Sequence, residues 1–143
     1  MITVENALKI VHAHLGHWGT EEIFLDQSLG RILQEEIVAD RDFPPFNRVT
    51  MDGIGLSFDQ FEKGQRVFEI KGVAPAGALQ KELQDSSCCL EVMTGATVPI
   101  GVDIVVRYED LEIQEGTATV RLSSLNRNQN IHFKGSDRRQ GSV

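Results

Sequence analysis

The chain has 143 residues, of which 41% are hydrophobic and 24% are charged, a composition typical of one globular domain with or without part of another. Its formal net charge of −7 argues against nucleic-acid binding, because affinity for nucleic acids comes chiefly from neutralising phosphates. No apolar run reaches the roughly 18 residues of a membrane-spanning helix, and the N-terminus lacks a secretory signal, so we expect a cytoplasmic protein without membrane association.

The first predicted element is a helix near the N-terminus. Thr3 can cap it, Gly16 can end it, and apolar residues recur at steps of three and four, which places them on one face. That face comprises Val4, Ala7, Leu8, Val11 and Leu15. Residues 26–30 then predict a short helical turn that ends at a glycine.

Short runs rich in β-branched residues come next and predict strands separated by turns. These runs are residues 37–38, 67–73, 88–93, 104–108, 111–114 and 117–122. Glu115-Gly116 joins the last two and predicts a hairpin, because glycine readily takes positive φ. The predicted fold class is α+β, mainly β: an N-terminal helix followed by a mostly antiparallel β domain.

The histidines and cysteines do not predict a metal site. His12 and His14 point nearly opposite ways on a helix, and neither they nor His17 has a nearby carboxylate or cysteine partner. Cys88 and Cys89 are adjacent, so on a strand we expect one thiol inside and the other outside, both reduced and structural.

A first polar motif comes directly after a stiff connector that contains two prolines. The prolines at 44 and 45 exclude an interior strand, because each lacks a backbone N–H, and the connector holds the motif in a fixed place. The motif ends in Met51-Asp52-Gly53. Asp52 is either a turn residue that bonds its own backbone or a functional carboxylate.

A second polar motif, Met93-Thr-Gly-Ala96, comes directly after a predicted strand. Its hydroxyl and its unhindered glycine N–H suit an anionic oxygen such as that of a phosphate or an oxyanion. A turn stabilised by threonine hydroxyls is the structural alternative. The spacing differs from that of a P-loop, because the motif lacks a subsequent Gly-Lys-Ser/Thr.

Together these motifs resemble those of the MoeA and gephyrin E-domain family. The matching segments are Asp42-Phe-Pro-Pro-Phe-Asn-Arg-Val-Thr-Met-Asp-Gly-Ile-Gly55 and Met93-Thr-Gly-Ala-Thr-Val-Pro-Ile-Gly-Val-Asp-Ile-Val-Val106. The start of the first helix, the Leu-Gly-Arg-Ile-Leu run at 29–33 and Gly135-Ser-Asp137 match in the same order. The resemblance covers essentially the whole chain.

The resemblance implies a role in molybdenum cofactor synthesis as a molybdopterin molybdenumtransferase. Such enzymes are homodimers that insert molybdenum from molybdate into molybdopterin or its adenylylated form with magnesium or another divalent cation. By resemblance Asp52 is the candidate catalytic residue, where it would orient a pterin N–H or help to position a metal. Thr94, Gly95, Met51 and Gly53 are candidate substrate-binding residues, and no metal ligand is assigned to this chain.

The resemblance also implies a division into three parts. Residues 1–40 would form a helix and the start of a linker domain, residues 41–130 a β domain of the MoeA N-terminal-region type, and residues 131–143 a return toward the linker domain. The catalytic α/β domain is absent from this chain, and the abrupt ending at Val143 suggests a fragment. We therefore expect the chain to supply one wall of an inter-subunit cleft and to be inactive alone.

The first motif departs from the family at several positions. Asn47-Arg-Val-Thr50 stands where the family carries Asp-Asn-Ser-Ala, and Ile54-Gly55 stands where it carries Tyr-Ala. These changes remove a carboxylate, a serine hydroxyl and an aromatic ring. The alternative function is therefore a non-catalytic scaffold, dimerisation or binding module that kept the fold and lost the chemistry.

Overall fold

The computed structural model describes residues 2–16 and 18–143. His17, one of the three histidines considered above, lies outside the described residues. Residue contacts divide the chain into two units, Met1–Ile37 and Val38–Val143, and each is described by itself.

The first unit contains the predicted helix, α1 (Val4–Ala13), and a short 3-10 turn, η1 (Leu25–Gln27). The cap is confirmed, because the Thr3 hydroxyl accepts a hydrogen bond from the Asn6 N–H at 3.3 Å. The helix ends earlier than its apolar spacing predicts. His14 is its C-cap residue, and the ring Nδ1 of His14 lies 2.8 Å from the Ile10 carbonyl oxygen.

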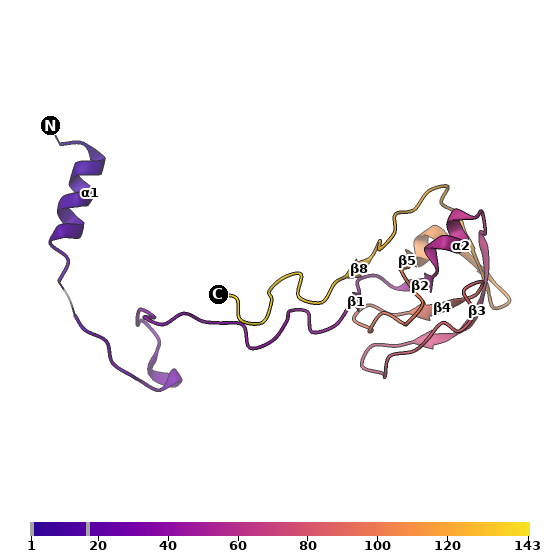
Figure 1. Cartoon of the computed structure of the whole chain (residues 1–143), viewed down its shortest axis with the longest axis horizontal. Coiled ribbons are helices and arrows are strands. Elements are labelled where there is room, and N and C mark those ends of the chain that lie inside the picture. Colours follow the sequence, from indigo (N-terminus) through magenta and orange to yellow (C-terminus); the bar gives the residue numbers. More distant parts are fainter. Residues whose placement is uncertain (1, 17) are drawn as a thin grey trace. The chain divides into compact units, whose positions relative to one another are not determined.

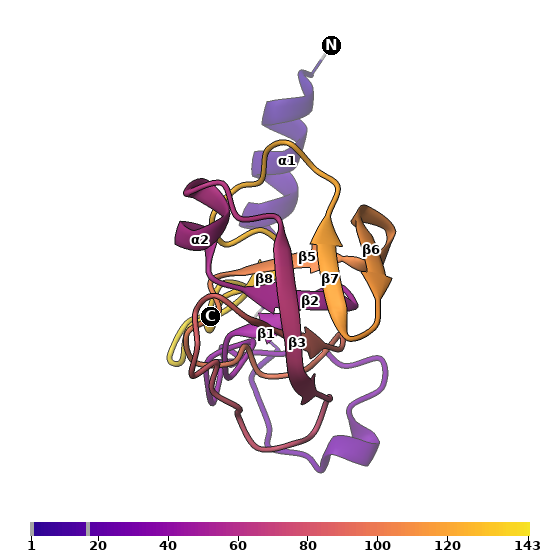
Figure 2. The same cartoon turned by 90° about the vertical axis from the view of Figure 1, so that its right-hand side faces the viewer.

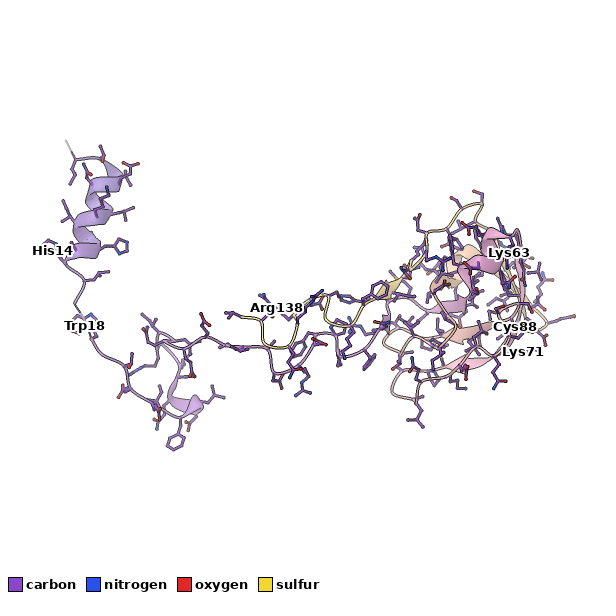
Figure 3. All side chains as sticks on the ribbon, viewed as in Figure 1. His14, Trp18, Lys63, Lys71, Cys88 and Arg138 are labelled. Carbon is purple, nitrogen blue, oxygen red and sulfur yellow. The ribbon has the colours of Figure 1, made fainter. Side chains whose placement is uncertain are left out.

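The described residues of the first unit form no hydrophobic core of their own. None of its described residues, 2–16 and 18–37, is buried. Trp18 is 93% exposed and Leu29 is 96% exposed, and His14 and Trp18 project from this unit in Figure 3. The apolar face that the sequence predicts for the helix therefore has no partner within this unit.

The second unit is built on a six-stranded sheet with the strand order β5-β2-β4-β3-β7-β6. Its strands are β2 (Gly53–Leu56), β3 (Val67–Ala74), β4 (Cys89–Val92), β5 (Ile104–Arg107), β6 (Leu111–Gln114) and β7 (Thr117–Val120). Neighbouring strands are antiparallel except β3 and β4, which are parallel. The sheet curves into a half-barrel, and β3 and β7 run across β2 and β5 in Figure 2. The predicted fold class is confirmed.

Five of the six predicted strands are present, as β3 to β7. The prediction for residues 37–38 is wrong: both are exposed and neither lies in a strand, and the backbone hydrogen bonds to the C-terminal segment begin only at Ala39. The strand β2 and the helix α2 (Phe58–Glu62) were not predicted. Two glycines in the four residues of β2 weaken its strand signal.

The predicted hairpin between β6 and β7 is confirmed. Gln114 pairs with Thr117, which leaves Glu115 and Gly116 as a two-residue loop. Their φ angles are +48° and +77°, as a type I′ turn requires.

The two ends of the second unit run side by side as an irregular ribbon (Figure 1). The short strands β1 (Arg48–Val49) and β8 (Ile131–His132) pair in antiparallel fashion at the base of the ribbon. Farther along, the Phe43 N–H donates to the Arg138 carbonyl oxygen at 2.7 Å. The Ala39 N–H donates to the Ser142 carbonyl oxygen at 2.8 Å. These bonds tie residues 38–49 to residues 131–143.

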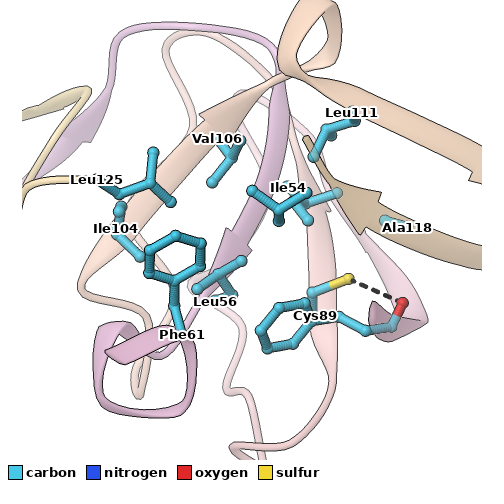
Figure 4. Packing of buried hydrophobic residues seen from close by; sticks show 11 residues of the cluster. Ile54, Leu56, Phe61, Cys89, Ile104, Val106, Leu111, Ala118 and Leu125 are labelled. Carbon is cyan, nitrogen blue, oxygen red and sulfur yellow. Dashed lines mark hydrogen bonds between the residues drawn. The ribbon is translucent and has the colours of Figure 1, made fainter. Parts of the chain in front are cut away.

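Apolar clusters cover both faces of the sheet. The first core cluster, shown in Figure 4, consists of Ile54, Leu56, Phe61, Phe68, Cys89, Ile104, Val106, Leu111, Ala118, Val120 and Leu125. The second core cluster consists of Val49, Ala74, Leu83, Cys88, Leu90, Val92, Ala96, Val98, Val102 and Val105.

The prediction that one cysteine points inward and the other outward is half wrong, because both faces of the sheet are covered. Cys88 and Cys89 do point to opposite faces, since they belong to different clusters. Both are buried, however, at 5% and 0% exposure, because a core covers each face. Both thiols are free, and Cys89 Sγ lies 3.9 Å from the Phe68 carbonyl oxygen.

Gly53 permits a close backbone approach between β2 and β5. It lies opposite Val92 on β4 and opposite Arg107 on β5. A Cβ at this position would lie 1.9 Å from the Val106 carbonyl oxygen and 2.9 Å from the Arg107 Cα. Because these obstructions are backbone atoms, no side-chain rotation relieves them, and β2 fits between its neighbours only with glycine here.

We therefore expect Gly53→Ala to destabilise the second unit by more than about 3 kcal/mol, as overpacking against rigid backbone does in its severe cases. Gly77→Ala is the matched control: Gly77 has a φ of +76° and open space around its Cα, so alanine there costs only backbone strain of roughly 1 kcal/mol. Urea unfolding followed by circular dichroism measures both. Equal losses in the two variants would contradict the close approach.

Candidate functional site

Asp52 directly precedes β2, the strand between β5 and β4, in the connection from β1. The Tyr108 N–H donates to the Asp52 carbonyl oxygen at 3.2 Å, which extends the pairing of β2 with β5 by one residue beyond Gly53 and Arg107. The backbone of Asp52 is thus held by the ladder, while its side chain is exposed.

The carboxylate of Asp52 joins the two motifs that the sequence singles out. Its Oδ1 accepts a hydrogen bond from the Thr94 N–H at 2.6 Å. This backbone N–H, followed by the Thr94 hydroxyl, holds the pKa of Asp52 below its ordinary value, and partial desolvation opposes the shift. Asp52 is therefore an ionised acceptor at neutral pH with a fixed orientation. It bonds a residue 42 positions away, not its own turn.

Gly95 contributes to this site through a backbone hydrogen bond that joins its turn to β1. It has a φ of +87°, and its N–H donates to the Val49 carbonyl oxygen at 2.9 Å. The Val49 N–H in turn donates to the Ala96 carbonyl oxygen at 2.9 Å. The expectation that the Gly95 N–H is free for a phosphate or an oxyanion therefore needs correction, because β1 pairs with this turn and occupies that donor.

Of the other predicted site residues, two have exposed side chains and one contributes only its backbone. Met51, next to Asp52, is 44% exposed, and the Thr94 side chain is exposed as well. Gly53 is buried and shapes the site only through the close approach described above. The structure thus brings Asp52 and Thr94 together at one surface, with Met51 beside them.

Two residues near this surface escaped the sequence reasoning. The Tyr108 hydroxyl donates to Glu91 Oε1 at 3.1 Å, and both side chains are half-buried. Burial, the Glu91 hydrogen bond and the charges of Glu91 and Asp52 raise the pKa of Tyr108 to about 12. The sequence alone offers one signal for the pair, a glutamate inside an otherwise apolar strand run.

The described residues do not form a metal centre. Among residues 2–16 and 18–143, no group of three or more His, Cys, Asp or Glu side chains is placed to hold a metal ion. Within the same residues, no helix is long and apolar enough to cross a membrane.

Comparison with known proteins identifies the family to which this sequence belongs. The sequence matches the family described as "MoeA N-terminal region (domain I and II)" over residues 2–143. It is 40% identical to the molybdopterin molybdenumtransferase of Synechocystis sp., over all of this chain and 37% of that protein. It is 32% identical to the enzyme of the same name from Staphylococcus epidermidis, over 99% of this chain and 35% of that protein.

Solved structures agree with the sequence comparison. The crystal structure of the molybdopterin biosynthesis moeA protein from Pyrococcus horikoshii OT3 superposes with a TM-score of 0.76 at 29% identity, over 86% of this chain and 33% of that chain. A second structure of the moeA protein from the same species gives a TM-score of 0.72 over 99% of this chain. The chain spans just over a third of the length of the relatives named here.

The hydrogen bonds to Asp52 predict its titration. In an NMR titration of the side-chain carboxyl, we expect Asp52 to have a pKa below the ordinary value, because the Thr94 N–H and hydroxyl stabilise the charged form. A depressed folded pKa contributes stability above the unfolded pKa, and this contribution is lost as the pH falls through the folded pKa. Thr94→Ala keeps the N–H and should raise the pKa only part of the way.

Asp85 is the internal control for that titration. Its pKa is also lowered, but by the hydroxyl and N–H of Ser87, so Thr94→Ala should leave it unchanged. An Asp52 that titrates at the ordinary value in the unsubstituted chain would show that the Thr94 hydrogen bond is not formed in solution.

Proposed function

We propose that this chain, which belongs to the MoeA family, supplies one wall of the active-site cleft of a homodimeric molybdopterin molybdenumtransferase. In this proposal residues 1–40 begin a linker domain, residues 41–130 form the β domain and residues 131–143 return to the linker. The observation that carries the proposal is the hydrogen bond between Asp52 and Thr94, because it joins the two family motifs at one exposed surface.

Asp52 is the proposed substrate-facing acceptor. A carboxylate fixed by a backbone N–H loses little orientational entropy when it binds a donor, which is the advantage of preorganisation. An ionised acceptor suits the N–H groups of the pterin ring of molybdopterin and not its phosphate. Asp52 would thereby position the pterin for the transfer of molybdenum from molybdate.

Thr94 is the proposed donor of the site. Its N–H and its hydroxyl both stabilise the ionised Asp52, and the Gly95 N–H is engaged by Val49, so Thr94 acts on the substrate by holding Asp52 in place. The family implies magnesium or another divalent cation, but the described residues assemble no ligand set for one. The proposal therefore assigns the residues of this chain to the substrate and derives no step through a metal.

A second candidate function, an association module without chemistry, is favoured by two observations. The substituted positions of the first motif serve packing in this chain: Asn47 Oδ1 accepts the Lys134 N–H at 2.9 Å, and Val49 is fully buried. The large apolar residues that are described in the first unit are all exposed. A measurement of activity separates the two candidates.

A chimeric enzyme tests the transferase proposal. We would replace the matching N-terminal region of the Synechocystis molybdenumtransferase with this chain and measure insertion of molybdenum into molybdopterin. We expect the chimera to be active and the chain alone to be inactive. Asp52→Asn should lower turnover by about 100-fold, which is typical for the loss of one positioning contact.

Glu109→Gln is the matched control, because it removes one exposed negative charge near the same surface without touching Asp52. Its turnover should equal that of the chimera. An inactive but folded and dimeric chimera, or full turnover in the Asp52→Asn variant, would instead support the association module.

The exposed helix face predicts self-association. Burying two apolar side chains contributes about 1.5–3 kcal/mol each, so replacing Leu8 and Val11 with glutamine should weaken a dimer that buries them by roughly 100-fold or more. Sedimentation equilibrium would show a shift toward the 15.9 kDa monomer. Lys9→Gln, outside the apolar face of α1, is the control. A chain that is monomeric before substitution would contradict homodimerisation through this helix.

A further inference from the structure

Glu91 and Tyr108 lie on the same face of the sheet as Asp52. In the register of the sheet, Ile54 is opposite both Glu91 on β4 and Val106 on β5. Asp52 directly precedes β2, two residues before Ile54, and Tyr108 directly follows β5, two residues after Val106. Continuing the alternation of the two strands by one residue places both side chains on that face. The Tyr108 N–H, which bonds the Asp52 carbonyl oxygen, shows that the pairing continues for one residue beyond the strands.

This shared face is the one that carries the first core cluster. Ile54 and Val106 belong to that cluster, and Tyr108 packs against it. The core therefore ends in a polar rim formed by the Asp52, Glu91 and Tyr108 side chains. Within this rim Glu91 and Tyr108 are half-buried, and Asp52 is exposed.

Tyr108 fixes the orientation of Glu91. Its hydroxyl donates to Glu91 Oε1 at 3.1 Å, while Oε2 accepts no hydrogen bond from residues 2–16 and 18–143. Burial and the neighbouring carboxylates raise the pKa of the Tyr108 phenol, so it is protonated at neutral pH and remains a donor to Glu91. The rim thus presents carboxylate oxygens in fixed positions, which are acceptors of hydrogen bonds.

The charge of the rim selects its ligand. Arg107 directly follows Val106 on β5 and therefore points to the other face, and it pairs with Asp110 at 2.9 Å. Two carboxylates repel phosphate and molybdate. They favour instead a planar group with several N–H donors on one edge, because a carboxylate accepts such donors in pairs.

We propose that Glu91, oriented by Tyr108, forms with Asp52 an acceptor site for the donor edge of a pterin ring, where an amino group stands beside a ring N–H. Glu91 is a binding residue in this proposal and Tyr108 a positioning residue. The proposal rests on the proposed function, since that function supplies a pterin as substrate. It adds two residues that neither family motif contains.

Two pteridines that differ in one group test this site. We would titrate the 143-residue chain with pterin and with lumazine, in which a carbonyl replaces the amino group, and follow backbone amides by NMR. Pterin should shift the amides of residues 91, 94 and 108. Lumazine should bind at least tenfold more weakly, because its carbonyl faces a carboxylate and one charge-assisted hydrogen bond is lost.

Variants separate the contribution of each residue. Glu91→Gln should weaken pterin at least tenfold and reduce the preference over lumazine, because an amide offers only one acceptor oxygen. Tyr108→Phe keeps the ring, and it should weaken pterin severalfold through the loss of Glu91 orientation. Glu109→Gln changes the net charge equally at an exposed neighbouring position and should bind pterin as the unsubstituted chain does.

The outcomes distinguish this inference from the function on which it rests. Weaker pterin binding in Glu91→Gln, with Glu109→Gln unchanged, would support the inference. Weaker binding in Asp52→Asn alone would overturn the role of Glu91 and leave the proposed function standing. Equal affinity for pterin and lumazine, or no shift at residues 91, 94 and 108, would overturn the site, and the chimera would then decide the function separately.

Discussion

The close approach of β2 to β5 at Gly53 is the constraint on which the rest of the second unit depends. With no side chain at this position, β2 can lie between β4 and β5 with the Val106 carbonyl oxygen where a Cβ would otherwise stand. Every residue of β2 is then buried, between one apolar cluster on each face. The same approach fixes where β2 begins, and so it fixes the position of Asp52 at the strand end.

The candidate site depends directly on that position. The Tyr108 N–H holds the Asp52 backbone, the Thr94 N–H holds its carboxylate, and pairing with Val49 holds the turn that presents Thr94. A charged acceptor is thus fixed by backbone groups, which do not have rotamers to lose. Because the donors of the second motif are used in this way, the surface is better suited to N–H groups of a ligand than to an anion.

The sequence predicted the features that arise from local patterns. The helix cap at Thr3, five strands and the Glu115-Gly116 hairpin all arise from residue type and period, and all are present. The sequence failed where long-range pairing decides the outcome. The glycines of β2 indicate a turn until their neighbours are known. Cys88 is buried in the second core cluster, which joins distant segments, and Glu91 meets Tyr108 only through the register of three strands. The two motifs pointed to Asp52 and Thr94, but not to the bond between them.

The hydrogen bond from Thr94 to Asp52 is the interaction whose observation in solution tests the proposed site most directly. A through-hydrogen-bond scalar coupling between the Thr94 amide nitrogen and the Asp52 side-chain carboxyl carbon would detect it. The structure predicts a measurable coupling at neutral pH that disappears when Asp52 is protonated, together with slow exchange of the Thr94 amide hydrogen. An absent coupling, with a Thr94 amide that exchanges as fast as in an unstructured peptide, would contradict the site.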